Sequence, residues 1–400
     1  MRQAGQPRPL PGRSKNTQML REFIKRFVFH IVYPCCYGIG RLKPLKKKKA
    51  VFVQTHGKIL SDNFELLYQK MKEEGYDNRI RFLRISDSGW GSIIRRSIGL
   101  LFEIADAGVI LLDESNSLMG SFRIREGSKV IQLWHACGAF KKWGYSVADK
   151  SFGDDAESLM RFSGHRNYSL VTVSGEQICW AYEEAFGLPV GGNIVRPLGV
   201  SRTDVFFDRG RRQEAFRKLE GLNLQTEGRQ IVAYLPTFRG SIAKAEGPKG
   251  FDVQKLLPFR KRYVFLIKNH PFVKEPFEIP ASCRDFVTQI GTQMSVEDML
   301  MTADVLITDY SSVIFEFSLM QKPMLFYAYD YDDYDLERGF YYPYRDFVPG
   351  KISENMDELT ESLKRIDEYD KKKLSDFRTH FMSGCDGHAT DRILEFITAS

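Results

Sequence analysis

The most polar turn of the chain lies between apolar segments near residue 310. The sequence VLITDYSSVIFEFSLMQKPMLFY, residues 305–327, predicts a strand, a tight turn, a helix and a second strand. Its turn contains five consecutive polar side chains: Thr308, Asp309, Tyr310, Ser311 and Ser312. Because serine hydroxyls and free N–H groups converge at a helix N-terminus, the turn predicts a phosphate-binding site. Helix capping, for which one such residue suffices, is the simpler alternative.

Two histidines follow predicted strands. His270, in IKNHPF, lies in the same half of the chain as the polar turn and is placed to reach the same anion. Its alternative role is a loop residue bonded to a backbone carbonyl. His135, in QLWHACGAFKKWGYS, ends a strand of the other half. Since the unperturbed pKa of histidine lies near neutral pH, His135 is the candidate general base toward a hydroxyl group.

The segment LPTFRG follows the first strand of the second half. Thr237 and Arg239 in this segment would overlook the same site, where a guanidinium could clamp phosphate oxygens. An exposed turn is the alternative. Glu316 lies one helical turn past Ser312, where it would accept hydrogen bonds from ribose hydroxyls or remain a solvated acid. Lys141 and Lys142 follow His135 closely. They are expected to contact a phosphate of the acceptor or a lipid headgroup, and solvated surface charge is the alternative.

The sequence offers no site for a metal or a resident cofactor. It contains no G-x-x-x-x-G-K-[ST] loop, no G-x-G-x-x-G after its first strand and no H-E-x-x-H. The six cysteines have neither zinc-ligand spacing nor the pattern of a disulfide framework, which favours a reducing compartment. The acidic run YDYDDYDLERG, residues 329–339, fits no cation-binding loop.

Short apolar strands alternate with helices around these residues. Strands are expected at 50–55, 79–85, 107–113, 129–134 and 168–174, with a glycine-terminated helix at 62–75 and a helix capped by Ser174 running to residue 186. A second series of strands begins near residue 230, with helices at 294–301 and 313–320. Such alternation predicts two doubly wound α/β domains that face each other across a cleft, with ligands at the carboxyl ends of the strands.

The N-terminal segment differs in charge from the rest. Residues 1–50 contain thirteen Lys or Arg and one acid, Glu22, whereas the remaining residues contain 45 basic and 50 acidic side chains. Apolar residues recur at helical spacing from Leu20 until Pro34 disturbs the pattern, with basic residues on another face. The helix is too short to span a bilayer, and no cleavable signal is evident. It therefore predicts an interfacial membrane anchor, with a packing helix and basic tail as the alternative.

The expected organisation has three parts. Residues 1–49 form a basic membrane-associating segment whose lysine run, Lys46, Lys47, Lys48 and Lys49, attracts anionic lipid. Residues 50–205 form an N-terminal acceptor domain. Residues 206–400 form the donor-binding domain, whose last helix packs back on the first domain. Nucleic-acid binding is not expected, because the lysine run lacks interleaved aromatic residues. Self-association is left open.

The chain resembles the CDP-glycerol:poly(glycerophosphate) glycerophosphotransferase family of teichoic-acid enzymes. The resemblance rests on VLITDYSSVIFEF followed by KPMLFYAYDYDDYDLERGFYY, with LPTFRG and NHP upstream, and extends to THGKILSDNFELLY and DGHATDRILEFI. It implies a GT-B-like fold at the cytoplasmic face of the membrane. The implied reaction transfers glycerol phosphate or ribitol phosphate from a CDP-polyol to a hydroxyl of an undecaprenyl-diphosphate-linked acceptor, with release of CMP.

The resemblance also implies roles for individual residues. His135 matches the family's candidate general base, and His270 matches the histidine that contacts the donor pyrophosphate. Ser311 and Ser312 match the phosphate-holding turn, and Glu316 matches the acid near the ribose. Many proteins of the family have His-Gly-Thr-Pro after the tryptophan, whereas this chain has HACGAFKKWG. This form is similar to that of the family's priming enzymes. With no long N-terminal module, this predicts addition of the first unit or a few units.

Two other functions fit the same pattern of residues. A nucleotide-sugar glycosyltransferase or epimerase of this architecture would also place phosphate donors and an acid in the second domain. A non-catalytic CDP-binding membrane protein would bind the nucleotide without releasing CMP. Turnover of a CDP-polyol, but not of UDP-sugars, distinguishes the predicted transferase from both.

Overall fold

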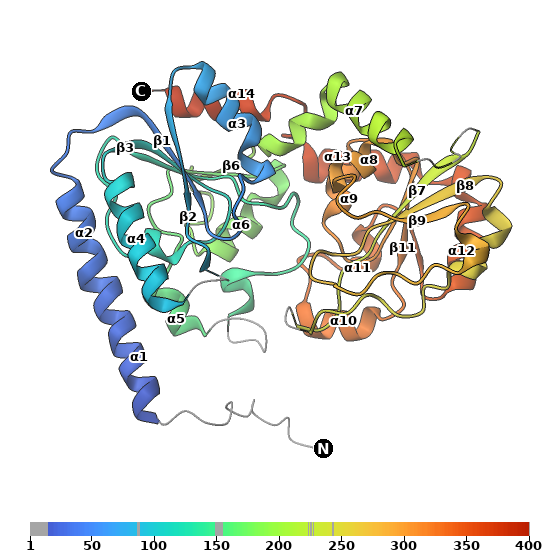
Figure 1. Ribbon diagram of the computed structural model, residues 1–400, viewed down its shortest axis with the longest axis horizontal. Helices are drawn as coiled ribbons and strands as arrows, with labels where there is room; N and C mark the ends of the chain where they lie inside the picture. The colour runs from blue at the N-terminus through green and yellow to red at the C-terminus, as the bar shows by residue number, and fades with distance from the viewer. Residues whose placement is uncertain are drawn as a thin grey trace.

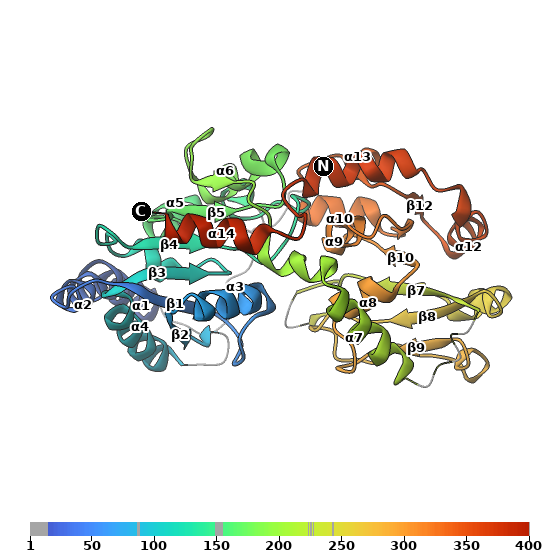
Figure 2. The same cartoon turned by 90° about the horizontal axis from the view of Figure 1, so that it is seen from above.

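The computed structural model describes residues 15–399 apart from 86–88, 149–154, 223, 225, 227 and 242–243. Figures 1 and 2 show two α/β domains side by side, with a long N-terminal helix along the outer side of the first. Each domain contains one six-stranded sheet. The first fourteen residues of the predicted membrane-associating segment lie outside the described residues.

The N-terminal domain is built on a parallel sheet with the strand order β2-β1-β3-β4-β5-β6. Its central strand β3 is buried at every residue, as expected for a sheet covered on both faces. The strands are β1 (Lys46–Gln54), β2 (Asp77–Phe82), β3 (Ala107–Leu112), β4 (Lys129–Gln132), β5 (Leu170–Thr172) and β6 (Val195–Arg196).

Helices cover both faces of this sheet. Ser61 begins α3 by accepting a hydrogen bond from the Asn63 N–H, and Gly75, at a φ of 78°, ends it as predicted. The helical segments are α3 (Asp62–Glu73), α4 (Trp90–Ile104), η3 (Ser117–Gly120), η4 (Gly144–Val147), α5 (Ala156–Arg161), η5 (Glu176–Ile178) and α6 (Cys179–Phe186).

The C-terminal domain repeats the arrangement with the order β12-β11-β10-β7-β8-β9, again all parallel. Its strands are β7 (Gln230–Leu235), β8 (Tyr263–Ile267), β9 (Val287–Gln289), β10 (Val305–Thr308), β11 (Met324–Tyr327) and β12 (Lys351–Ser353). Its helical segments are α7 (Arg209–Glu220), η8 (Val253–Phe259), η9 (Ala281–Cys283), α8 (Val296–Thr302), α9 (Val313–Ser318), α10 (Tyr331–Arg338), α11 (Tyr344–Phe347), α12 (Met356–Lys364) and η10 (Ile366–Glu368).

The chain crosses between the domains twice. Segment η6 (Ser201–Phe207) leads into the second domain, and α13 (Lys371–Met382) and α14 (Ala389–Thr398) lead back. Ile393 and Ile397 of α14 share an apolar cluster with Phe64 and Leu67 of the first domain. The two parallel sheets confirm the predicted class of two α/β domains.

The N-terminal helix continues through the predicted disturbance at Pro34. It consists of α1 (Lys15–Phe27), a π-helical turn η1 (Val28–Val32) and α2 (Tyr33–Gly40). The Tyr33 N–H bonds to the Val28 carbonyl, five residues back, and Pro34 lies in the first turn of α2. The π turn widens the helix where the proline ring would otherwise meet the preceding turn, so the helix runs on to Gly40.

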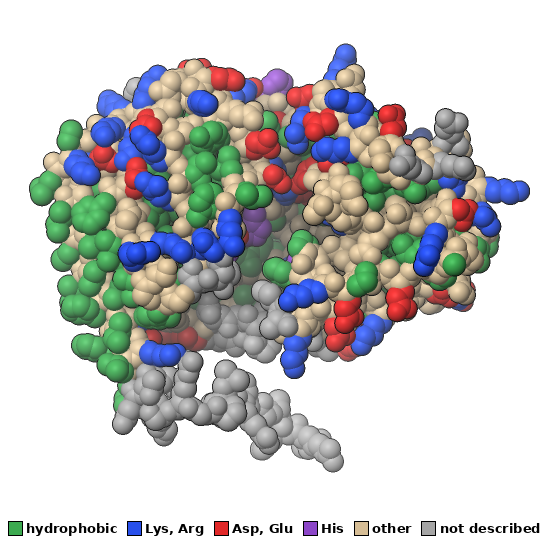
Figure 3. Space-filling view, viewed as in Figure 1, with side chains coloured by type: hydrophobic (Ala, Val, Ile, Leu, Met, Phe, Trp, Pro, Cys, Tyr) green, Lys and Arg blue, Asp and Glu red, His purple; other side chains and the backbone are tan. Residues whose placement is uncertain are grey.

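This helix has two apolar faces. Val28, Tyr33 and Tyr37 are buried in the core of the first domain. Other apolar side chains of the same helix are exposed, among them Leu20, Phe23, Phe27 and Ile31. Figure 3 shows hydrophobic side chains along this edge of the molecule. Among the described residues, none of the helices has the length and apolar character needed to cross a bilayer.

The lysine run belongs to the first sheet. Strand β1 begins at Lys46, so the predicted boundary after residue 49 falls inside the strand. Lys46, Lys47 and Lys48 are exposed, but Lys49 is buried and its ammonium group lies 2.6 Å from the Asp106 carboxylate and 2.9 Å from that of Glu103. This corrects the predicted role of Lys49, because a buried ammonium requires anionic partners and is not available to lipid.

A loop of the first domain packs into the second. The Phe140 carbonyl accepts the Tyr341 N–H at 2.9 Å, and the Lys142 N–H donates to the Gly339 carbonyl at 3.1 Å. The Phe140 ring contacts the rings of Phe340 and Phe347. Together these contacts fix the segment that follows His135 against the C-terminal domain.

Ser174 supports the same loop and does not cap a helix. Its hydroxyl accepts the Gly138 N–H at 2.8 Å and donates to the Phe381 carbonyl at 2.7 Å. The predicted cap is wrong because these two partners use the hydroxyl, and α6 begins only at Cys179.

Substitution Gly138→Ala should destabilise the protein. Gly138 has a φ of 65°, and a Cβ atom there would lie 2.3 Å from carbons of the Phe315 ring. We expect the free energy of unfolding to fall by about 1–3 kcal/mol, the usual range for overpacking. Urea unfolding of the purified protein measures this change.

Gly99→Ala is the matched control. This glycine lies in α4 with nothing near its Cβ position, so the substitution should raise stability by about 0.5–1 kcal/mol. An unchanged midpoint for Gly138→Ala would show that the Phe315 ring moves aside freely.

Candidate active site

The histidines and the polar turn follow strands of the two sheets. His135 follows β4, His270 follows β8, and the turn at 308–312 follows β10. Lys141 of the first domain pairs with Phe340 of the second, and after burial its charge is the second cause that lowers the pKa of the His270 imidazole. Figure 3 shows histidine side chains in the hollow between the domains. The strand ends of both sheets therefore border one cleft, as the sequence predicts.

His135 has the geometry of a neutral base. Its Nδ1 lies 3.1 Å from the Asp113 carbonyl oxygen. Because a carbonyl only accepts hydrogen bonds, Nδ1 carries the proton and Nε2 keeps its lone pair. The side chain is accessible from the cleft, yet surrounding protein desolvates it and lowers its pKa. The imidazole is thus unprotonated at neutral pH.

A buried glutamine fixes the backbone that presents His135. The Gln132 Oε1 accepts the Trp134 N–H at 2.9 Å, and its amide donates to the Glu114 carbonyl and the Tyr168 hydroxyl, both at 3.1 Å. Trp134 adopts a φ of 57°, which is uncommon for a residue other than glycine. This turn directs His135 out of the sheet, and the Trp134 ring stacks on its imidazole at 4.4 Å.

The Asp113 carboxyl group lies in the same buried layer. Burial raises its pKa to about 6. Its Oδ2 lies 3.5 Å from the Asn63 amide nitrogen, and its Oδ1 has no hydrogen-bond partner among the described residues. The group therefore changes charge close to neutral pH beside the carbonyl that orients His135.

His270 has the opposite hydrogen-bonding pattern. Its Nδ1 accepts the Phe272 N–H at 3.2 Å, so in the neutral ring Nε2 carries the proton. Burial, and then the charge of Lys141, lower the pKa of the half-buried imidazole. Its Nε2–H is thus available as a donor to an anion in the cleft.

The predicted phosphate-binding set divides into buried and accessible members. Thr237, Thr308 and Asp309 are buried. Their side chains form hydrogen bonds between the end of β7 and the end of β10. The Asp309 Oδ1 accepts the Thr237 N–H at 2.9 Å and its hydroxyl at 3.0 Å, and the Thr308 hydroxyl donates to the Leu235 carbonyl at 2.6 Å. These three side chains join β7 to β10 and place the turn between them.

Arg239 also binds protein groups. Its guanidinium donates to the carboxylates of Asp309 and Asp330 and to Thr237. Burial opposes its charge, but Asp309 and Asp330 raise its pKa above the ordinary value. The arrangement differs from the predicted phosphate clamp, because two carboxylates already neutralise the side chain.

Ser311 and Ser312 are the accessible members of the turn. Both are half-buried at the start of α9. The Ser311 hydroxyl lies 3.4 Å from the Val313 N–H, and Ser312 makes no side-chain capping bond. The turn therefore combines weak capping by Ser311 with a Ser312 hydroxyl that the helix does not use.

Glu316 is buried at the junction of the domains, where it pairs with Arg202 of η6. Burial lowers the pKa of Arg202, but the charge of Glu316 more than offsets this and raises it. The second Glu316 oxygen has no hydrogen-bond partner among the described residues. The sequence analysis missed Arg202, because nothing in VSRTDVFF distinguishes this arginine from a surface residue.

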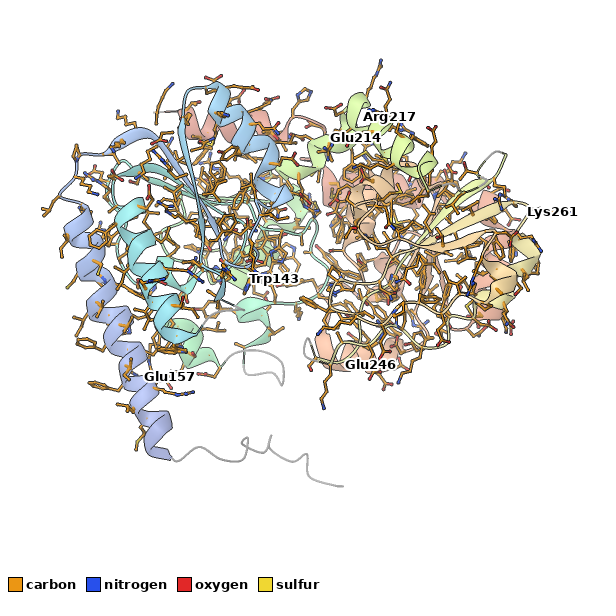
Figure 4. All side chains as sticks on the ribbon, viewed as in Figure 1. Trp143, Glu157, Glu214, Arg217, Glu246 and Lys261 are labelled. Atoms are coloured by element: carbon orange, nitrogen blue, oxygen red, sulfur yellow. The ribbon has the colours of Figure 1, made fainter. Side chains whose placement is uncertain are left out.

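Lys141 and Lys142 lie at the contact between the domains. The Lys141 ammonium donates to the Tyr334 hydroxyl at 3.1 Å, and that of Lys142 lies 6.0 Å from the Tyr341 ring centre. Trp143 follows on the side of the first domain that faces the second and contacts the Tyr341 ring at 5.2 Å (Figure 4). Lys141 thus lies near His270 on the C-terminal side of the cleft.

The acidic run at 329–339 is used for packing and ion pairing. Asp330 pairs with Arg239, and the residues after it form α10. Within the described part of the chain, no three His, Cys, Asp or Glu side chains are grouped so that they could hold a metal ion.

Comparison with known proteins identifies the family. Residues 35–399 match the profile described as CDP-Glycerol:Poly(glycerophosphate) glycerophosphotransferase. A teichoic acid ribitol-phosphate primase of Bacillus spizizenii is 32% identical over 95% of this chain and 98% of its own. A teichoic acid poly(ribitol-phosphate) polymerase of the same organism is 34% identical over 92% of this chain, which spans only 58% of that protein. Relatives named for glycerol phosphate match at 26–29% identity.

Solved structures share the fold. The wall teichoic acid polymerase TagF, in a histidine variant, superposes with a TM-score of 0.74 and 22% identity, covering 95% of this chain and 97% of the solved one. A TagF structure soaked with CDPG has a TM-score of 0.69. The profile match and the primase together show that the chain belongs to the CDP-glycerol:poly(glycerophosphate) glycerophosphotransferase family.

Proposed function

We propose that the protein transfers ribitol phosphate from CDP-ribitol to a hydroxyl of an undecaprenyl-diphosphate-linked teichoic-acid or capsule precursor, releasing CMP. The observation that carries this proposal is the pair of histidines on opposite sides of the cleft. His135 offers a lone pair at Nε2 and His270 a proton at Nε2. Phosphoryl transfer to a hydroxyl needs such a base and such a donor.

The chemistry follows from these two atoms. The acceptor oxygen attacks the β-phosphorus of the donor while its proton moves to the His135 Nε2. The bond from the β-phosphorus to the bridging oxygen breaks, and CMP leaves with that electron pair. His270, Ser312 and Lys141 donate to the phosphate oxygens, whose negative charge increases at the leaving group. These protein groups need no metal, so transfer should persist in EDTA.

Ribitol is favoured over glycerol by the comparison of relatives. Those named for ribitol phosphate are 32–34% identical to this chain, whereas those named for glycerol phosphate are 26–29% identical. The CDPG-soaked TagF structure supports a CDP-linked donor.

The exposed face of the N-terminal helix supports peripheral attachment to the cytoplasmic face of the membrane. Apolar side chains such as Phe23, which is 67% exposed, would enter the lipid interface. The exposed Lys46, Lys47 and Lys48 would attract anionic headgroups. Attachment would hold the enzyme in the plane of its lipid-linked acceptor.

The decisive experiment measures CMP release by the purified full chain. CDP-ribitol and CDP-glycerol are each supplied with a synthetic lipid-linked disaccharide and with the same lipid already carrying one glycerol phosphate unit. Release from CDP-ribitol supports the proposal, and release only from CDP-glycerol overturns the choice of polyol. Turnover of UDP-sugars would indicate a glycosyltransferase or epimerase, and CDP binding without release would indicate a non-catalytic protein.

Substitution His135→Ala should lower CMP release by at least 100-fold, the lower end for loss of a general base, while CDP binding stays unchanged. His388→Ala is the control, because this exposed histidine lies at the start of α14 and its side chain pairs with Asp391. Stopped-time assays and calorimetric CDP titration separate the two effects. Equal activity of the two variants would exclude His135 as the base.

The dependence of kcat/KM on pH should show the protonation of His135. Desolvation lowers its pKa, so kcat/KM should fall on acidification only below the ordinary histidine value of about 6.5. Asp113, with a pKa of about 6, titrates in the same range. Asp113→Asn removes that group but keeps the carbonyl bond to His135, so an acidic limb that persists in this variant belongs to the histidine. A limb above pH 7 contradicts the assignment.

The exposed face of the helix should bind anionic membranes. We expect sedimentation with phosphatidylglycerol vesicles and little with phosphatidylcholine. Phe23→Gln should weaken binding about tenfold, because burial of a phenylalanine side chain contributes about 1.5–3 kcal/mol. Val190→Gln, at an exposed site outside the helix, is the matched control. Equal loss in both variants would argue against a specific membrane face.

A further inference from the structure

A second cavity lies beneath the N-terminal helix, apart from the histidine site. It has a volume of about 250 Å³ and is lined by the helix, the end of β2, the start of α4 and the loop after β3. Most of its lining is apolar and includes Phe29, Tyr33 and Ile94. Trp90 and Ile85, which belong to its lining, are 53% and 40% exposed.

One buried polar group in this cavity lacks a partner. Asn116 is 2% exposed, and its Oδ1 accepts the Leu118 N–H at 3.1 Å. Its Nδ2 has no hydrogen-bond partner among the described residues. Buried amide donors are normally satisfied, so this atom indicates a ligand that accepts hydrogen bonds. Lys25 also lines the cavity, and its ammonium group lies 3.9 Å from the centre of the Phe162 ring.

The cavity borders the exposed helix and the loop after β3. Val28 and Phe29 line it, and their neighbours Phe27 and Ile31 belong to the exposed apolar face. On its inner side, Asn116 lies three residues after Asp113, whose carbonyl orients His135. An apolar chain that entered from the lipid would thus reach a buried amide in the loop that also contains Asp113.

We propose that this cavity binds the part of the acceptor's isoprenoid chain that adjoins the diphosphate, with the Asn116 amide donating to a diphosphate oxygen. The inference rests on the proposed function, because only a lipid-linked acceptor supplies such a ligand. The cavity is smaller than the roughly 300 Å³ of typical small-molecule pockets, so it takes a short segment of the chain. The remaining chain stays in the membrane.

Tryptophan quenching tests occupancy without turnover. The full chain in detergent micelles is titrated with a fifteen-carbon isoprenyl diphosphate that carries bromine, a short-range quencher of tryptophan. We expect saturable quenching that disappears in Trp90→Phe, which removes one of four tryptophans. Ile93→Gln in the cavity wall should weaken binding about tenfold. Val190→Gln, at an exposed site outside both the helix and the cavity, should leave it unchanged.

Asn116→Asp tests the polar end. The carboxylate keeps an acceptor for the Leu118 N–H but removes the amide donor and adds negative charge. Binding of the diphosphate should weaken, whereas binding of the corresponding uncharged isoprenol should not. Quenching that is absent, that persists in Trp90→Phe, or that is equally strong with brominated phosphatidylglycerol would overturn the proposal.

Assays with acceptors of different isoprenoid chain length test the cavity separately from the proposed reaction. With acceptors that share one head and carry a long or a one-isoprene chain, Ile93→Gln should raise KM for the long chain alone. An equal effect on both acceptors would overturn the cavity assignment. If the wild-type protein releases no CMP with either acceptor but shows the expected quenching pattern, the proposed reaction fails while the isoprenoid site stands.

Discussion

The buried Asp309 carboxylate accepts hydrogen bonds from the loop after β7 and from the turn after β10. Its oxygens bind the backbone and hydroxyl of Thr237, the Tyr310 N–H and the Arg239 guanidinium. A carboxylate without these partners would not be stable inside the domain. Since Ser311 and Ser312 follow it directly, the position of the accessible serines depends on this buried group.

A second buried pair connects this half of the cleft to the other. Glu316 of α9 pairs with Arg202 of η6, and the loop of Gly138 and Phe140 packs against the C-terminal domain nearby. The loop begins three residues after His135. A rotation of the domains that moved this loop would therefore shift the proposed base relative to the C-terminal domain. Removal of one member of such a pair leaves an uncompensated charge, so the contact stabilises the arrangement seen here.

The sequence predicted the alternating strands and helices, because their apolar patterns are local. It did not predict the side-chain contacts between residues that are far apart in the chain. Apolar strand periodicity identified β1, β3 and β10, and the positions of His135 and His270 at strand ends placed both in the cleft. The use of Arg239 could not be predicted, because its partner Asp330 is 91 residues away. Lys49 looked like its lysine neighbours, since only the folded strand shows that one of the four points inward to Asp106.

The N-terminal helix was also predicted only in part. Its composition indicated an amphipathic helix with one apolar face, but the structure shows apolar residues on two faces. A helix that only packs on its domain needs one such face. The second face exposes large apolar side chains to water, an arrangement that is stable in a folded protein when lipid or another partner covers it. Because the cavity lies beneath this helix, the proposed membrane attachment would bring the cavity close to the lipid.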